Sequence, residues 1–108
     1  MNEQQPAALS PQQQAMLEVF GAHMQAEIVT QSVDDALATM TDSPHVNHVP
    51  VMTGGVGRDG VRAFYTDHLI GQFLPPDTET TTISRTIGTD QIVEESVAAF
   101  THSMQVNY

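Results

Sequence analysis

The sequence predicts an α+β fold, because helical patterns dominate its first two thirds and Thr- and Val-rich strand patterns dominate its end. The predicted order is helix, helix, strand, helix, strand, strand, which lacks the strand–helix alternation of a doubly wound parallel sheet. At 108 residues the chain has the length of one domain. We expect residues 1–10 to form a disordered tail and residues 11–108 to form a single domain.

Two helices are predicted at the N-terminal end. Ser10 and the proline after it are typical of a helix start. The apolar residues that follow recur every three or four positions, as in an amphipathic helix: Leu17, Phe20, Met24 and Ile28. Ser32 predicts the N-cap of a second helix, with Asp34 and Asp35 in its first turn. That helix should end at "TDSP", residues 41–44.

The remaining elements are predicted mainly as strands. "HVNHVPVM", residues 45–52, has alternating β-branched residues and predicts a strand, followed by a tight turn at Gly54 and Gly55. A helix should begin near Arg58 and end before two consecutive prolines at 75 and 76. Residues 78–88 and 92–106 predict two long strands joined by a turn.

The stretch "GVGRDG", residues 55–60, has the G-x-G-x-x-G spacing of dinucleotide-binding loops. Those loops lead through a helix into a strand that carries an acidic residue at its far end. Here the helix runs into the prolines, and Asp77 and Glu79 stand at the start of the next strand. We therefore expect no cofactor and interpret the glycines as the turn between strand and helix.

The charge balance is strongly acidic, with thirteen Asp and Glu against three arginines, and a formal net charge of −10. This balance disfavours nucleic acid and anionic membrane surfaces as partners. The absence of lysine fits either a high-salt cytoplasm or a GC-rich genome. The absence of cysteine excludes disulfides and thiolate chemistry. "MNEQQPAALSPQQQ" has no basic region or apolar run, so we expect a cytoplasmic protein without a signal peptide.

Histidines near the middle of the chain raise the question of a metal site. In a regular strand His45 and Asn47 lie on one face and His48 on the other, so the two histidines cannot chelate one ion together. We therefore expect no metal.

The same histidines are candidates for a small-molecule site, because polar groups embedded in apolar stripes are what such a site requires. We predict catalytic roles for His45, His48 and His68, and substrate-binding roles for Asn47, Phe64, Tyr65, Phe100 and His102. An isolated histidine on an apolar face is more often a hydrogen-bonded core residue than a catalyst, and both interpretations stay open.

Three segments of the chain resemble a known group: "PHVNHVPVMTGG", residues 44–55; "VRAFYTDHLIGQF", residues 61–73; and "LPPDTE", residues 74–79. From about residue 15 onward the pattern resembles the SnoaL-like polyketide cyclase branch of the nuclear transport factor 2-like superfamily. The resemblance implies helices packed on a strongly curved, mostly antiparallel sheet that forms a cone-shaped cavity. It also implies cofactor-independent cyclase or isomerase chemistry, in which a base removes a proton next to a carbonyl group of an apolar substrate.

The resemblance also implies that strands are missing at the C-terminal end and that a second copy of the chain is a partner. Members of that branch continue with further strands, so we expect the last strands of the family fold to be missing here. The strand near residues 91–106 should then expose an edge that a second copy covers, which predicts a homodimer. Two functions remain open: a small-molecule-binding protein with cyclase or isomerase activity, and a non-catalytic dimerising or ligand-binding module.

Overall fold

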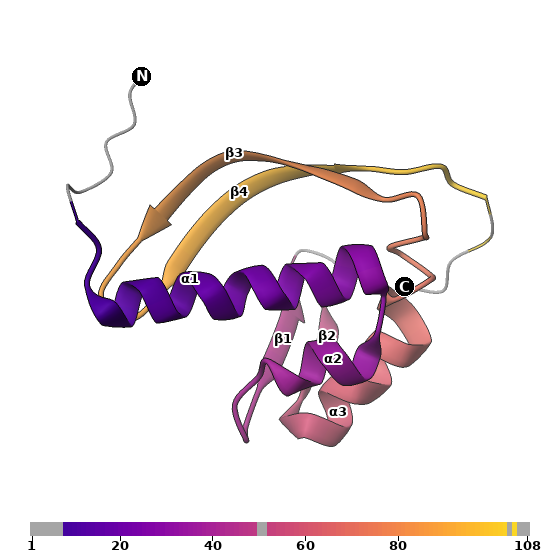
Figure 1. The fold of residues 1–108 in the computed structure, drawn as a ribbon. Helices are drawn as coiled ribbons and strands as arrows, with labels where there is room; N and C mark the ends of the chain where they lie inside the picture. The colour runs from indigo at the N-terminus through magenta and orange to yellow at the C-terminus, as the bar shows by residue number, and fades with distance from the viewer. Residues whose placement is uncertain (1–7, 50–51, 104, 106–108) are drawn as a thin grey trace.

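The chain folds into an α+β structure, as predicted. A computed structural model of the chain describes residues 8–49, 52–103 and 105. In Figure 1 a long β-hairpin arches over the first helix, and the shorter elements lie below it. The elements are α1 (Pro11–Met24), η1 (Gln25–Thr30), α2 (Val33–Ala38), β1 (His45–His48), β2 (Thr53–Val56), α3 (Gly57–Phe64), η2 (Tyr65–Leu69), β3 (Glu79–Ile87) and β4 (Ile92–Ala99). Most of the predicted disordered tail, residues 1–7, lies outside the described residues.

Both predicted helix starts are confirmed by their caps. The Ser10 hydroxyl accepts a hydrogen bond from the Gln13 backbone N–H at 3.1 Å, and the Gln13 side chain accepts one from the Ser10 N–H at 3.0 Å. The Ser32 hydroxyl accepts from the Asp35 N–H at 3.1 Å. These bonds satisfy backbone donors that a helix leaves unpaired at its start.

Two of the helices continue without a break into π-helical turns. The segment α1 runs on as η1, and α3 runs on as η2. Gln31 ends η1 in the left-handed conformation, with φ 51°, and its side-chain amide donates to the Leu74 carbonyl at 2.9 Å. This bond holds the end of the first helical unit against the segment that follows η2. π-Helical turns are rare and occur frequently at functional sites.

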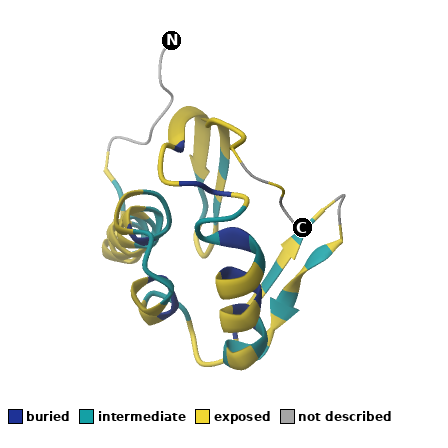
Figure 2. Cartoon of the chain, turned by 90° about the vertical axis from the view of Figure 1, so that its right-hand side faces the viewer, coloured by how far each residue is buried: buried dark blue, intermediate teal, exposed yellow. Residues whose placement is uncertain are grey.

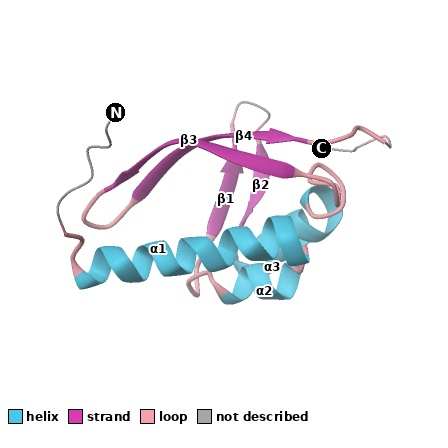
Figure 3. Ribbon diagram, turned by 45° about the horizontal axis from the view of Figure 1, so that its top comes forward, coloured by secondary structure: helices cyan, strands magenta, loops and turns pink. Residues whose placement is uncertain are grey.

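The strands form two separate two-stranded antiparallel sheets in the described part of the chain (Figure 3). In the first sheet β1 pairs with β2, so that His45 lies opposite Val56 and His48 opposite Thr53. The predicted strand over residues 45–52 is therefore too long, because it ends at His48; residues 50 and 51 lie outside the described residues. The predicted turn at Gly54 and Gly55 is also wrong, because both residues belong to β2.

The glycines of β2 are required by close backbone contacts. A methyl group on Gly54, whose φ is 154°, would clash with the carbonyl oxygen of Val46 across the sheet. A methyl group on Gly55 would clash with the carbonyl of Gly60 in α3. The glycines thus allow β2 to pack between β1 and α3. Glycine has low strand propensity, so the sequence pattern indicated a turn where tertiary packing makes a strand.

In the second sheet β3 and β4 form a hairpin, and the predicted turn is confirmed by a bond from the Gly88 N–H to the Gln91 carbonyl at 2.8 Å. The predicted strand over residues 92–106 is too long, because β4 ends at Ala99. Ala99 lies opposite Glu79, the first residue of β3, so beyond it β4 has no partner strand.

The core lies among η1, α2, α3 and η2 rather than under the hairpin. Leu37 of α2 and Val61 of α3 are fully buried. The core cluster consists of Ala26, Ala36, Leu37, Val61, Phe64, Tyr65, Leu69 and Leu74. Figure 2 shows the same distribution, with the buried residues gathered on the inner side of α3 and most of the hairpin exposed.

Two contacts fix the hairpin to α1. The Gln13 side-chain amide donates to the Gly88 carbonyl at 3.2 Å. The Arg85 guanidinium lies 5.3 Å from the centre of the Phe20 ring and is paired with Glu94 at 2.6 Å. The hairpin tip therefore stays next to the first turns of α1, where it forms one wall of a pocket.

We predict that Gly54→Ala lowers the free energy of unfolding by about 1–3 kcal/mol, because the added methyl group meets backbone rather than a flexible side chain. Gly21→Ala is the matched control, since a methyl group built there meets no heavy atom within 4 Å apart from its chain neighbours and the backbone of its own helix. In the helix interior it should raise the free energy of unfolding by up to about 1 kcal/mol. Urea unfolding measures both changes. A stable Gly54→Ala protein would contradict the pairing of β1 with β2.

Candidate functional site

A network of polar side chains connects α1 to the elements that follow it. His23 of α1 contacts Glu27 of η1, Thr39 at the end of α2 and Tyr65 of η2; these four residues are called the His23 network. His23 Nε2 lies 2.7 Å from Glu27 Oε2 and 3.1 Å from the Tyr65 hydroxyl, and His23 Nδ1 lies 2.7 Å from Thr39 Oγ1. The side chains of His23 and Glu27 are 20% and 13% exposed, so the network is largely screened from water.

Local helix geometry and packing place these groups together. Residues four apart share a helix face, which brings His23 to Glu27 within one helical unit. Tyr65 is only 2% exposed and is the first residue of η2, so its hydroxyl reaches the carboxylate from the opposite helix. Glu27 and Tyr65 both belong to π-helical turns, so both irregular turns of the chain's helices contribute to the same network.

The hydrogen-bond partners favour one arrangement of the protons in this network. The Thr39 hydroxyl donates its proton to the Ala36 carbonyl at 2.7 Å, so its oxygen accepts from His23 Nδ1–H. The Tyr65 hydroxyl donates to Glu27 Oε2. An ionised Glu27 accepts at the same oxygen from His23 Nε2–H. In this arrangement a doubly protonated His23 ring pairs, as an imidazolium cation, with the Glu27 carboxylate.

The pKa values shift in the directions that this assignment requires. The hydrogen bond to Glu27 raises the pKa of His23, although burial opposes the shift. Burial would raise the pKa of Glu27, but the hydrogen bonds from His23 and Tyr65 and the charge of His23 outweigh it and lower that pKa. Burial, followed by the negative charge of Glu27, raises the pKa of Tyr65, which stays a protonated donor.

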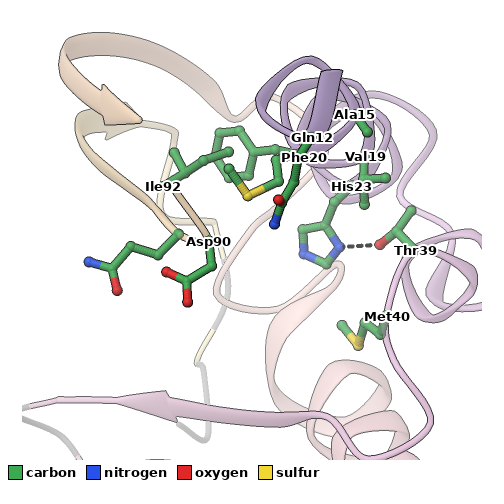
Figure 4. Close-up of a pocket in the computed structure, with 11 residues that line it drawn as sticks. Gln12, Ala15, Val19, Phe20, His23, Thr39, Met40, Asp90 and Ile92 are labelled. Atoms are coloured by element: carbon green, nitrogen blue, oxygen red, sulfur yellow. Dashed lines mark hydrogen bonds between the residues drawn. The ribbon is translucent and has the colours of Figure 1, made fainter. Parts of the chain in front are cut away.

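A pocket of about 500 Å³ lies beside the network, between α1 and the tip of the hairpin (Figure 4). We call it the α1 pocket. It is lined by Gln12, Ala15, Met16, Val19, Phe20 and His23 of α1, by Thr39 and Met40, and by Asp90, Gln91 and Ile92 of the hairpin. Its volume lies within the roughly 300–1,000 Å³ usual for small-molecule sites. Figure 4 shows His23 and Thr39 at one wall, with Ile92 and Asp90 approaching from the hairpin side.

The predicted site residues occupy different parts of the molecule. The predicted alternation along β1 is confirmed: His45 and Asn47 are exposed, while His48 is half-buried on the other face. His48 and His68 both lie next to Phe64, with ring centres 5.0 and 6.1 Å from it. Burial lowers the pKa of His48, although the charge of Glu27 opposes the shift.

The other predicted site residues also lie in separate parts of the molecule. Tyr65 belongs to the His23 network and stacks edge-on to Phe64, with ring centres 6.1 Å apart. Phe100 contacts Phe73, with ring centres 5.9 Å apart, and His102 is exposed beyond the end of β4. His45 and Asn47 border a second hollow of about 490 Å³ on the β1–β2 hairpin. The structure thus brings together His48, His68, Phe64 and Tyr65, and leaves the remaining four elsewhere.

The sequence did not point to His23, Glu27 or Thr39. A signal was present in the sequence, because His23 and Glu27 are four residues apart within the apolar stripe of the first helix. That spacing indicates an ion pair on a helix, which is common on surfaces. Only the tertiary contacts with Tyr65 and Thr39 turn this pair into a partly buried network.

The structure and the comparisons add three findings about class. Among residues 8–49, 52–103 and 105, no three histidine, cysteine, aspartate or glutamate side chains are grouped so that they could hold a metal ion. No helix in the described part of the chain has the length and apolar character needed to cross a membrane. No protein-family model, curated protein or solved structure matches the chain significantly. The fold and the site therefore define a small α+β protein with an apolar pocket beside a partly buried His–Glu–Tyr network.

We predict that the His23 network makes stability depend on pH. The pKa of His23 is raised on folding, so its contribution is complete below its ordinary value of 6.5 and is lost as the pH rises through the raised value. The pKa of Glu27 is lowered, so its contribution is complete above 4.5 and is lost as the pH falls through the lowered value. Between pH 4.5 and pH 6.5 the contributions of both groups to stability are complete.

Urea unfolding at a series of pH values tests this prediction. In wild type the free energy of unfolding should fall as the pH rises through the raised pKa of His23, and His23→Gln should remove this fall. Glu27→Gln should weaken the pH dependence on both the acid and the alkaline side. His45→Gln, which replaces an exposed histidine of β1, is the control and should keep the wild-type profile. A His23→Gln profile parallel to that of wild type would show that the ion pair does not form.

Proposed function

We propose that this chain is a SnoaL-like small-molecule-binding protein, which holds a predominantly apolar molecule in the α1 pocket and exchanges a proton with it through His23. The observation that carries the proposal is the position of His23, which lines an apolar pocket with its ring and is held as a cation by Glu27. An apolar cavity with a few fixed polar groups, one of them with a shifted pKa, is the usual form of a small-molecule site.

The proposal extends the resemblance described above. The α1 pocket would be the cone-shaped cavity, and β3 and β4 would belong to its curved sheet. The chemistry would be that of a cofactor-independent cyclase or isomerase, acting next to a carbonyl group of the bound molecule. An imidazolium can donate a hydrogen bond to a carbonyl oxygen as negative charge develops on it, after exchanging one of its present partners. The geometry favours His23 as the acid of such a reaction rather than its base.

We expect that blocking the α1 pocket abolishes ligand binding. Ala15 is exposed on α1 and lines the pocket, so Ala15→Trp should fill the cavity without disturbing the core. Ala22→Trp places the same side chain on an exposed position of α1 outside the pocket and is the matched control. Thermal unfolding with aromatic polyketides, steroids and terpenoid epoxides measures binding. A ligand at a hundredfold excess over its Kd adds about 2.7 kcal/mol of stability.

A ligand that stabilises wild type and Ala22→Trp, but not Ala15→Trp, would support the pocket. Comparing His23→Gln with His68→Gln then separates the two candidate sites. If His23→Gln loses catalytic turnover of a bound carbonyl compound, His23 is supported as the catalytic residue. If only His68→Gln loses turnover, the catalytic site lies instead near Phe64, beside His68. A ligand that stabilises Ala15→Trp as much as wild type would exclude the α1 pocket.

One observation favours the second function, a dimerising module. Because Ile92 lines the α1 pocket and Glu94 pairs with Arg85 above Phe20, the alternate residues of β4 face away from α1. Two of them are the apolar residues Val93 and Val97, which are 55% and 54% exposed. A second copy of the chain would cover this face of the hairpin.

We expect Val97→Lys to shift the chain toward a monomer, because a charge placed opposite its own copy opposes association. Val29→Lys, at an exposed valine of η1 rather than of the hairpin, is the control and should leave the association unchanged. Analytical ultracentrifugation at several concentrations measures the change. A wild-type protein that stays monomeric at every concentration would exclude this second function.

A further inference from the structure

The charges around the α1 pocket are unevenly distributed. Among its lining residues only His23 and Asp90 carry charge, and the positive charge of His23 is compensated by Glu27 at 2.7 Å. The carboxylate of Asp90 is on the hairpin tip, between Gly88 and the first residue of β4. The lining therefore has one uncompensated negative charge.

No arginine is placed to receive an anion in this pocket. The chain has three arginines and no lysine, and each arginine contacts a partner elsewhere. Arg58 donates to the Thr41 carbonyl at 3.1 Å, and Arg62 pairs with Asp34 at 2.6 Å. Arg85 lies above Phe20, which lines the pocket, but Glu94 neutralises it at 2.6 Å. The formal net charge of −10 adds a field that repels anions from the whole molecule.

The two ends of the pocket differ in what they offer a ligand. At the inner wall both nitrogens of His23 already have partners, Thr39 on one side and Glu27 with Tyr65 on the other. Between the two ends, side chains such as Val19, Phe20 and Ile92 form an apolar surface, and the uncharged Gln12 amide lies beside it (Figure 4). At the hairpin end the polar groups are the Asp90 carboxylate and the Gln91 amide. An apolar body thus fits the middle, and a positively charged donor fits the hairpin end.

From this arrangement we infer that the α1 pocket selects protonated amines carried on an apolar body, and that it discriminates against carboxylates of the same shape. The ammonium group lies at Asp90, and the apolar body extends along α1 toward His23. This inference rests on the proposed function, because it assigns a ligand class to the same pocket. The attraction between the ammonium and Asp90 is that of a partly exposed ion pair, which is modest and is screened by salt.

Three matched probes test the inference on the full chain: naphthylmethylamine, naphthylmethanol and naphthoate. They share one apolar ring system and differ in charge. In low salt, isothermal titration calorimetry should show the amine binding about threefold more tightly than the alcohol, and about tenfold more tightly than the carboxylate. Asp90→Asn should abolish this preference, so that the amine and the alcohol bind about equally. Asp67→Asn removes one charge from an exposed site outside the pocket and should keep the preference.

The outcomes separate this inference from the proposed function. Equal binding of the three probes, blocked by Ala15→Trp, would overturn the charge selection and leave the pocket as the binding site. An amine preference that survives Asp90→Asn would also overturn the inference, because another group would then be its source. Binding of none of the probes would overturn the inference, and the polyketide, steroid and epoxide series would then decide the proposed function independently.

Discussion

The burial of the Glu27 carboxylate is the constraint on which the arrangement of the helices depends. A carboxylate that is only 13% exposed is costly unless donors replace the water that it has lost. Those donors are the Tyr65 hydroxyl and the His23 ring, which come from η2 and α1. The same residue therefore ties the first helical unit to the third. Thr39, at the end of α2, fixes the other side of the imidazole ring.

This constraint also decides the chemical character of the site. The negative charge of Glu27 acts on both His23 and His48, yet their pKa values shift in opposite directions. For His23 the direct hydrogen bond outweighs burial, so the cation is favoured. For His48 burial outweighs the more distant charge, so the neutral ring is favoured. Acid–base sites usually contain titratable groups whose pKa values are shifted in opposite directions by their surroundings. The proposed function therefore centres on this part of the molecule.

The hairpin has a different physical basis from the helical core. It contributes one wall of the α1 pocket, yet most of its residues are exposed on both faces (Figure 2). An isolated two-stranded hairpin is only marginally stable in water, so the contacts of Gln13 with Gly88 and of Arg85 with Phe20 matter for holding this wall of the pocket in place. A molecule in the pocket or a second copy on the outer face would add to these contacts. The two proposed functions therefore act on the same element, from opposite sides.

The sequence by itself determined the fold class, the helix starts at Ser10 and Ser32, the turn between β3 and β4, and the alternation along β1. Each of these depends on neighbours within a few residues, where periodicity and capping act. Tertiary structure alone decided that Gly54 and Gly55 form a strand, because the partners that require glycine there lie in other elements. It also decided the His23 network, since Glu27 and Tyr65 are 38 residues apart. No local pattern records which distant hydroxyl will donate to a partly buried carboxylate, because that pairing forms only when the helices pack.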